Sequence, residues 1–400
     1  MLPVKPSPWR WVVLAVFSGV NLSIQTLWIT YAPITGQAAT LYGTSELGIG
    51  LLAMSFMLAF LPLSIPASWV IDTRGFRFGV GVGAALMAIF DPLRGLVGTS
   101  YPLVLTCTVM LAAAQPFVLN AWTKCAALWF PRKERATAVG VITLANLVGT
   151  GIGMAVTPEL VKTFTIPQVQ LIYGVAAAVT SALFFAFARE KPATPPEPDE
   201  EVTRALMLDG LKSAVQLRGF QLTLAVMFVG MGVFNGITTW IEGIVRPRGL
   251  DPEQAGTLGA IMLVGGLVGA IVIPAISDRT ARRGPFIVAG VIMAMPGVLG
   301  IAFAPNFTTI AIASGWLGFW LTSVLPISMQ YAAELTRPTP EGTSSGLLQL
   351  VGQASVAYVY VMEAMRSSDG AFTPSLLLAV VLLAIAAVLA SRLRDAPKPT

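Results

Sequence analysis

The stretch LPLSIPASWVIDTRGFRFGVGVG, residues 61–83, contains the feature that decides the fold. A long apolar run ends in a charged turn that carries Asp72, Arg74 and Arg77, and the chain then becomes apolar again. An apolar run of about 20 residues is long enough to cross the hydrocarbon core of a bilayer as a helix. The stretch therefore predicts two membrane-spanning helices joined by a short charged turn.

The composition of the whole chain agrees with a membrane protein. Of its 400 residues, 55% are hydrophobic and 11% are charged, and the mean hydropathy is +0.75. A soluble globular domain has about 25% charged residues. The net charge of +5 suits orientation in a bilayer better than nucleic-acid binding. We expect the lipid bilayer as surroundings, no nucleic-acid partner, and a first apolar run retained as a helix rather than cleaved as a signal peptide.

The rarity of histidine and cysteine restricts the chemistry. The chain has no histidine, and its two cysteines, Cys107 and Cys125, lie in one apolar segment. Neither a metal site nor a disulfide framework is expected, and we predict no cofactor. A membrane-bound acyl or glycosyl transferase would need a catalytic histidine or paired carboxylates and a sizeable aqueous domain. We therefore predict a protein that is not an enzyme, with a non-transporting receptor or scaffold as a remaining alternative.

Apolar segments of spanning length recur along the chain as six plus six. They are expected at residues 11–34, 46–71, 78–98, 101–128, 135–161, 168–188, 219–244, 254–276, 285–303, 306–332, 341–365 and 373–391. The stretch between the sixth and seventh is rich in Pro and in charge of both signs, as a solvated linker is. We predict an all-α integral membrane protein of 12 transmembrane helices in two pseudo-symmetric six-helix bundles. The parts are a bundle at 1–188, a cytoplasmic linker at 189–218, a bundle at 219–394 and a cytoplasmic tail at 395–400.

The basic residues predict the orientation. Most of the 25 Lys and Arg residues fall in segments on the same side as the N-terminus. Cytoplasmic segments carry such an excess of Lys and Arg. We expect a multi-pass protein of the cell membrane with both termini and the linker in the cytoplasm.

The charged turn has a second copy at the matching place in the second half. The stretch IPAISDRTARRGPF, residues 273–286, carries Asp278, Arg282 and Arg283. A turn repeated between the second and third helices of two halves indicates the internal symmetry of a transporter. Basic residues that only hold the topology would explain the arginines, but acids contribute little to topology.

The first copy resembles the signature loop of the major facilitator superfamily, Gly-x-x-x-Asp-x-x-Gly-x-Arg. It reads here as Ser68, Asp72, Gly75 and Arg77, with serine in place of the first glycine. The second copy has Ala281 where the other glycine would be. The resemblance implies that Asp72 braces the outward-facing state against the helix that starts near Thr339 and Pro340, with Asp278 as its counterpart. The predicted gating residues are Asp72, Arg74, Arg77, Lys124, Asp278, Arg282 and Arg283.

Uncharged polar residues gather near mid-bilayer. By the rise of about 1.5 Å per residue, several lie about 12 to 17 residues into their helices. Each one alone is as consistent with hydrogen bonding between helices, but together they suggest a cavity lining, since transporter substrates bind near the midplane. The predicted substrate-binding residues are Gln25, Trp28, Gln115, Asn120, Asn146, Asn235, Gln349 and Gln353.

Few charges lie deep in the predicted spans. Asp91 and Arg94 are three residues apart on one helix and are expected to neutralise each other. Glu242 is expected nearer the outer surface, paired with Arg246. Asp91 and Glu242 are the possible proton sites. Without an acid at the cavity centre, facilitated diffusion by alternating access is favoured, and a proton-coupled exporter of drugs or metabolites is the alternative.

Four segments resemble a narrower family. LWITYAPI (27–34), PLSIPASWVIDTRGFR (62–77), AAAQPFVLNAWTKCAALWF (112–130) and AAELTRPTPEGTSSGLLQLVGQ (332–353) are similar to segments of the feline leukaemia virus subgroup C receptor-related transporters. That family is associated with choline, ethanolamine and haem.

The resemblance implies roles for individual residues. Trp28 corresponds to the tryptophan that contacts the choline ammonium, and Gln115 and Gln353 to two cavity glutamines. Asn235 stands where the choline carriers have a second aromatic residue, and the lack of histidine disfavours haem. The expected substrate is a small organic solute, either a choline-like amine or a flat heterocycle, and the expected state is a monomer.

Overall fold

The computed structural model describes residues 7–192, 215–280, 282–336 and 341–393. All regular secondary structure in these ranges is helical. The chain divides into two compact units, Met1–Glu201 (unit 1) and Val202–Thr400 (unit 2). The division falls inside the stretch 189–218 that the sequence predicts to be a linker. Most of that stretch, the predicted tail, and Thr339 and Pro340 lie outside the described residues.

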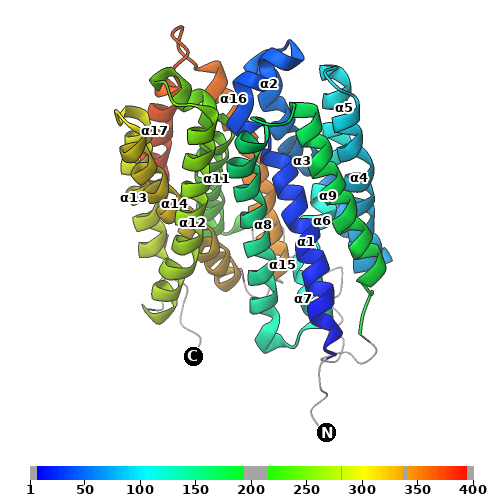
Figure 1. Cartoon of the computed structure of the whole chain (residues 1–400). Helices are drawn as coiled ribbons and strands as arrows, with labels where there is room; N and C mark the ends of the chain where they lie inside the picture. The colour runs from blue at the N-terminus through cyan, green and yellow to red at the C-terminus, as the bar shows by residue number, and fades with distance from the viewer. Residues whose placement is uncertain (1–6, 193–214, 281, 337–340, 394–400) are drawn as a thin grey trace. The chain divides into compact units, whose positions relative to one another are not determined.

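The helices of each unit follow the predicted spans, and Figure 1 shows those of a unit running alongside one another. Unit 1 contains α1 (Trp9–Ile29), η1 (Ala32–Ile34), α2 (Thr35–Tyr42), α3 (Glu46–Arg74), α4 (Phe76–Leu96), α5 (Tyr101–Ala112), α6 (Gln115–Leu119), α7 (Trp122–Trp129), α8 (Arg132–Leu160) and α9 (Ile166–Phe187). Unit 2 contains α11 (Arg218–Val245), η2 (Arg246–Arg248), α12 (Pro252–Thr280), α13 (Gly284–Phe303), α14 (Phe307–Leu335), α15 (Glu341–Ala354), α16 (Val356–Ala364) and α17 (Thr373–Ala390).

Eleven helical stretches of the described residues are long and apolar enough to cross a membrane. The segment predicted at 341–365 is not among them, and it is divided at Ser355 into α15 and α16, which are 14 and 9 residues long. The predicted span at 101–128 is also divided, into α5, α6 and α7. The predicted all-helical membrane fold is confirmed, with interrupted helices where two continuous ones were expected.

The two units repeat the same pattern of helix packing. In unit 1, α4 packs on α9, α3 on α5 and α1 on α9. In unit 2, their counterparts by position pair in the same way, α13 with α17, α12 with α14 and α11 with α17. This repetition is the structural form of the symmetry that the two charged turns indicate.

Glycines bring α12 and α14 into close contact. A Cβ atom added at Gly269 would fall on the carbonyl oxygen of Phe319, and one at Gly318 on that of Met262. Small residues at such positions let two membrane helices pack backbone against backbone. The packing of these two helices therefore depends on the absence of a side chain.

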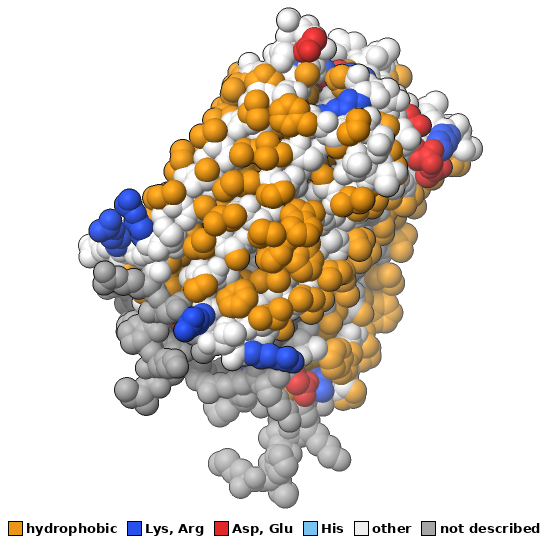
Figure 2. All heavy atoms as spheres, turned by 90° about the vertical axis from the view of Figure 1, so that its left-hand side faces the viewer, with side chains coloured by type: hydrophobic (Ala, Val, Ile, Leu, Met, Phe, Trp, Pro, Cys, Tyr) orange, Lys and Arg blue, Asp and Glu red, His pale blue; other side chains and the backbone are white. Residues whose placement is uncertain are grey.

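The outward surface has the character expected beside lipid. Figure 2 shows a broad hydrophobic band on the face that carries α13 and α17, with charged side chains gathered towards its two ends. Exposed apolar side chains on these two helices are Ile292, Leu299, Phe303, Leu377, Val381, Ile385 and Val388. Such a continuous apolar surface is stable only where lipid covers it.

Candidate substrate-binding site

The first part of the candidate site comes from α1. Gln25 and Trp28 are one turn apart on this helix and both are buried. The indole Nε1 of Trp28 donates a hydrogen bond to the carbonyl oxygen of Ala53 on α3, at 3.2 Å. The side-chain carbonyl oxygen of Gln25 is buried without a hydrogen-bond partner among the described residues. Trp28 is therefore held in one orientation, whereas Gln25 keeps an unused acceptor.

Gln115 is the first residue of α6, directly after the break that follows α5. Pro116 comes next and has no N–H to offer the preceding turn, which suits a helix start. The Gln115 side chain is 3% exposed, and in the described part of the chain its carbonyl oxygen has no hydrogen-bond donor. Since α6 contacts α1, unit 1 brings the three predicted residues Gln25, Trp28 and Gln115 onto neighbouring elements.

The arrangement can recognise a solute with donor groups. A buried carbonyl oxygen left without a donor costs free energy comparable to a lost hydrogen bond, so a ligand that supplies N–H or O–H groups binds favourably. The face of an indole ring attracts a cation. Together these groups suit a small cation with hydrogen-bond donors.

Asn120 and Asn146 have different surroundings. The Nδ2 of Asn120 donates to the backbone carbonyl and the hydroxyl of Ser64 and to the hydroxyl of Ser68, at 3.0 to 3.1 Å. It thus holds α6 to α3, and its partner Ser68 is the residue that departs from the signature loop. Asn146 lies on α8, and its Nδ2 is buried with no partner among the described residues.

In unit 2 the predicted residues lie on two contacting helices. Asn235 on α11 and Gln353 on α15 are buried, and Gln349 on α15 is half-buried. The helices α11 and α15 contact each other. Unit 2 therefore carries the three predicted amide side chains on two helices that pack together.

The charged turn of unit 1 has partners within that unit. The Nζ of Lys124 on α7 lies 3.0 Å from Oδ1 of Asp72 at the end of α3. The guanidinium of Arg74 lies over the ring of Phe78, at 6.0 Å, and Nη2 of Arg77 donates to the carbonyl oxygen of Phe185 at 3.0 Å.

Glu190 contacts this turn, and the sequence did not predict it. Its carboxylate accepts hydrogen bonds from the backbone N–H groups of Phe76, at 2.8 Å, and Arg77, at 2.7 Å. These are the first N–H groups of α4, which lack partners inside the helix. Gly75 has φ +96°, and a Cβ there would collide with the Glu190 carboxylate. A motif search could not find Glu190, because it lies over a hundred positions along the chain.

In the charged turn of unit 2, the ion pair has the opposite arrangement of charges. The Nη2 of Arg283 lies 3.1 Å from Oε1 of Glu334 on α14, and its Nη1 donates to the hydroxyl of Ser277. Arg282 is exposed, and the Asp278 side chain lies outside the described residues. In unit 1 the turn supplies the acid and the fourth span the base, whereas unit 2 reverses the signs.

The two possible proton sites are both paired with arginine. Asp91 Oδ1 lies 2.7 Å from Nη2 of Arg94, and both side chains are 0% exposed. Arg94 also donates to the carbonyl oxygen of Leu27 and lies over the ring of Tyr31. Glu242 is buried and forms an ion pair with Arg246. The expected pairing of these charges is confirmed.

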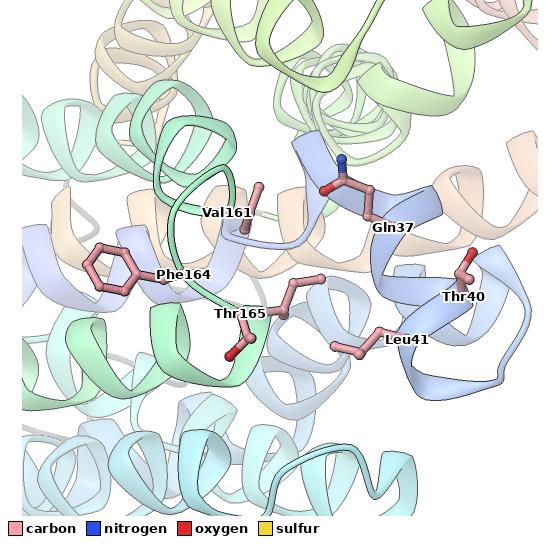
Figure 3. Close-up of a pocket in the computed structure, with 7 residues that line it drawn as sticks. Gln37, Thr40, Leu41, Val161, Phe164 and Thr165 are labelled. Atoms are coloured by element: carbon pink, nitrogen blue, oxygen red, sulfur yellow. The ribbon is translucent and has the colours of Figure 1, made fainter.

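A pocket of about 480 Å³ lies elsewhere in unit 1. Figure 3 shows α2 on one side of it, with Gln37, Thr40 and Leu41, and the connection from α8 to α9 on the other. Its lining holds no charged side chain and none of the predicted substrate-binding residues. It is therefore a separate feature from the candidate site.

A chain of this kind, with repeated bundles of membrane-spanning helices and buried polar groups inside each, has the construction of a secondary transporter. The family model of the Major Facilitator Superfamily matches residues 11–360 and 249–400. The chain therefore belongs to the major facilitator superfamily, and it is a transporter rather than an enzyme.

Its relatives confirm the narrower resemblance. Solute carrier family 49 member A3 of Danio rerio is 30% identical over 377 residues, which cover 90% of this chain and 79% of that protein. The choline/ethanolamine transporter FLVCR2 of Homo sapiens is 28% identical over 370 residues, covering 88% and 70%. The choline/ethanolamine transporter FLVCR1 of Mus musculus is 29% identical over 382 residues, covering 87% and 68%.

Solved structures share the fold at low sequence identity. A bacterial homologue of the human lysosomal transporter Spinster, inward-facing and unoccupied, superimposes with a TM-score of 0.77 at 18% identity, over 99% of this chain and all 100% of that one. The nucleoside transporter NupG gives a TM-score of 0.75 at 11% identity, over 96% and 99%. These likenesses concern the fold alone.

Proposed function

We propose that the chain carries a small organic amine with hydrogen-bond donors across the membrane, by facilitated diffusion with alternating access. The observation that carries this proposal is the pair of buried side-chain carbonyl oxygens of Gln25 and Gln115, which have no partners among the described residues. The names of the relatives, choline/ethanolamine transporters, support the same substrate class.

The acceptors favour a primary amine alcohol over a quaternary one. An ethanolamine-like solute has N–H donors and a hydroxyl, enough for both carbonyl oxygens and for the ring face of Trp28. A choline-like solute has a single donor, its hydroxyl, and leaves one buried acceptor unsatisfied. Asn235 stands where the resemblance gives the choline carriers an aromatic ring, so unit 2 lacks an aromatic face for a quaternary ammonium at that position.

Replacing Gln115 with leucine should weaken ethanolamine binding about tenfold, because a hydrogen bond to a charged group is lost. Binding is measured as the concentration of ethanolamine that stabilises the purified protein in a thermal-shift titration, with choline beside it. Gln37→Leu is the matched control, since Gln37 is exposed on α2 and apart from the candidate site. Equal affinity in wild type and Gln115→Leu would overturn the assignment of the site.

The facilitative mechanism rests on the paired acids. Asp91 and Glu242 each lie beside an arginine, so neither is a lone carboxylate poised to carry a proton. The alternative, a proton-coupled exporter of drugs or metabolites, predicts that an imposed pH gradient drives uptake into proteoliposomes. Ethanolamine flux that ignores such a gradient supports facilitated diffusion, and flux that follows it overturns it.

Gating is proposed for the charged turns, with Asp72 and Asp278 bracing the outward-facing state. Asp72→Asn should shift the protein towards the inward-open state, because the negative charge that is proposed to brace the outward-facing state is lost, and leave the intrinsic affinity for ethanolamine within about twofold. The readout is the reactivity of single cysteines introduced on either side. Glu159→Gln, which removes another exposed ion pair, is the control. A large loss of affinity with unchanged cysteine reactivity would contradict the gating role.

A further inference from the structure

One end of unit 1 carries a group of exposed cations around the point where α3 ends, α4 begins and α9 ends. They lie within two residues of Gly75 or of Glu190, whose carboxylate is bonded to the start of α4. The four residues, called here the α4 basic cluster, are Arg74, Arg77, Arg189 and Lys191.

The acids beside this cluster are already engaged. Asp72 is paired with Lys124 at 3.0 Å. Glu190 accepts from the two backbone N–H groups of Phe76 and Arg77, so its charge is offset by the start of α4. Among the described residues, none of the four cations has an acidic side-chain partner. The cluster therefore presents an uncompensated positive charge.

Aromatic side chains place these cations at the lipid-facing perimeter. The guanidinium of Arg74 lies over Phe78, which is 51% exposed, and that of Arg189 lies 4.5 Å from the ring centroid of Trp9. Arg77 donates to the backbone of Phe185, which is 43% exposed. Tryptophan side chains at the ends of membrane helices lie at the level of the lipid headgroups.

The ends of the spans place the cluster at the membrane boundary. One span ends at Arg74, the next begins at Phe76, and a third ends at Phe187. Headgroup phosphates lie at that level, and basic side chains beside a spanning helix attract anionic lipids. The start of α4 is not itself available to a phosphate, because Glu190 occupies its first N–H groups, so the side chains carry the recognition.

We propose that the α4 basic cluster binds the headgroup phosphate of an anionic phospholipid, with Arg77 and Arg189 as its principal contacts. Arg77 lies in the first turn of α4, where its backbone N–H donates to the Glu190 carboxylate, and Arg189 directly precedes Glu190 after the end of α9. A phosphate bound there joins the start of α4 to the end of α9 and so reinforces the contact that Glu190 already makes.

The test measures binding of dioleoylphosphatidylglycerol to the purified full-length protein in detergent by native mass spectrometry. The double variant Arg77→Gln/Arg189→Gln should weaken the tightest binding step at least about tenfold, because each basic residue at the membrane surface contributes to the attraction. The control Arg279→Gln/Arg282→Gln removes the same charge from two exposed arginines of unit 2. It should leave that step within about threefold.

Three outcomes would overturn the proposal. Equal weakening in both double variants would mean that net charge alone governs binding. Undiminished binding by the unit 1 variant would place the lipid elsewhere. The third outcome concerns inorganic phosphate without lipid. If it stabilises the wild-type protein against heat, and that stabilisation is lost only in the unit 1 variant, the cluster binds a free anion. A unit 1 variant that retains the wild-type thermal stability in neutral lipid excludes misfolding as the cause.

Discussion

Replacing Asp91 with alanine should lower the free energy of unfolding by about 3–5 kcal/mol, since breaking a buried ion pair leaves its partner charge uncompensated. Arg94 is 0% exposed, and its Nη2 lies 2.7 Å from Oδ1 of Asp91. Its other contacts are the carbonyl oxygen of Leu27 and the ring of Tyr31, and neither carries a compensating charge. The measurement is thermal or denaturant unfolding in detergent.

The matched control removes both charges together. A buried ion pair replaced by apolar groups of similar volume is often neutral for stability. Asp91→Leu/Arg94→Met should therefore be more stable than Asp91→Ala, although it carries one more substitution. If the change in unfolding free energy of the double variant equals the sum of the changes at the two sites, the ion pair makes no specific contribution and the expectation is wrong.

The second large effect is expected at the contact of α12 with α14. Gly269→Ala should destabilise unit 2 by about 1–3 kcal/mol, the cost of overpacking a close contact. The added Cβ meets the backbone carbonyl of Phe319, and backbone cannot move aside as a flexible side chain can. The readout is the melting temperature in detergent together with ethanolamine flux.

The control is the same substitution at a glycine where an added Cβ meets no neighbouring atom. Gly151 lies inside α8, and a Cβ there has nothing within 4 Å. Gly151→Ala should be neutral or stabilising by up to about 1 kcal/mol, because alanine favours helix over glycine. Equal effects at Gly269 and Gly151 would mean that the two helices tolerate separation.

Much of the fold follows from the sequence. Apolar runs of spanning length locate the helices, and the turn at Asp72 with its copy at Asp278 indicates two similar halves. The ion pairs of Asp91 with Arg94 and of Glu242 with Arg246 were also predictable. Spacings of three and four residues place side chains on one face of a helix, whatever surrounds it.

The candidate site was predictable only in part. Counting depth along each helix selects Gln25, Trp28 and Gln115, which are buried on contacting elements of unit 1. Asn120 is also among the predicted substrate-binding residues, but its amide donates to Ser64 and Ser68 instead. Depth is set by the number of residues from a helix end, whereas the direction of a side chain depends on the rotation of the helix against its neighbours.

The sequence by itself determined the spans, the repeated charged turns and the pairs made within one helix, because each depends on local composition or spacing. Tertiary structure alone decided that Lys124 pairs with Asp72, that Glu334 pairs with Arg283, and that Glu190 closes the start of α4. These partners come from distant helices, and packing sets which of several available charges lies within reach. The breaks at Ser355 and before Gln115 were likewise not predicted, since residues 341–365 and 101–128 each read as one continuous span in the sequence.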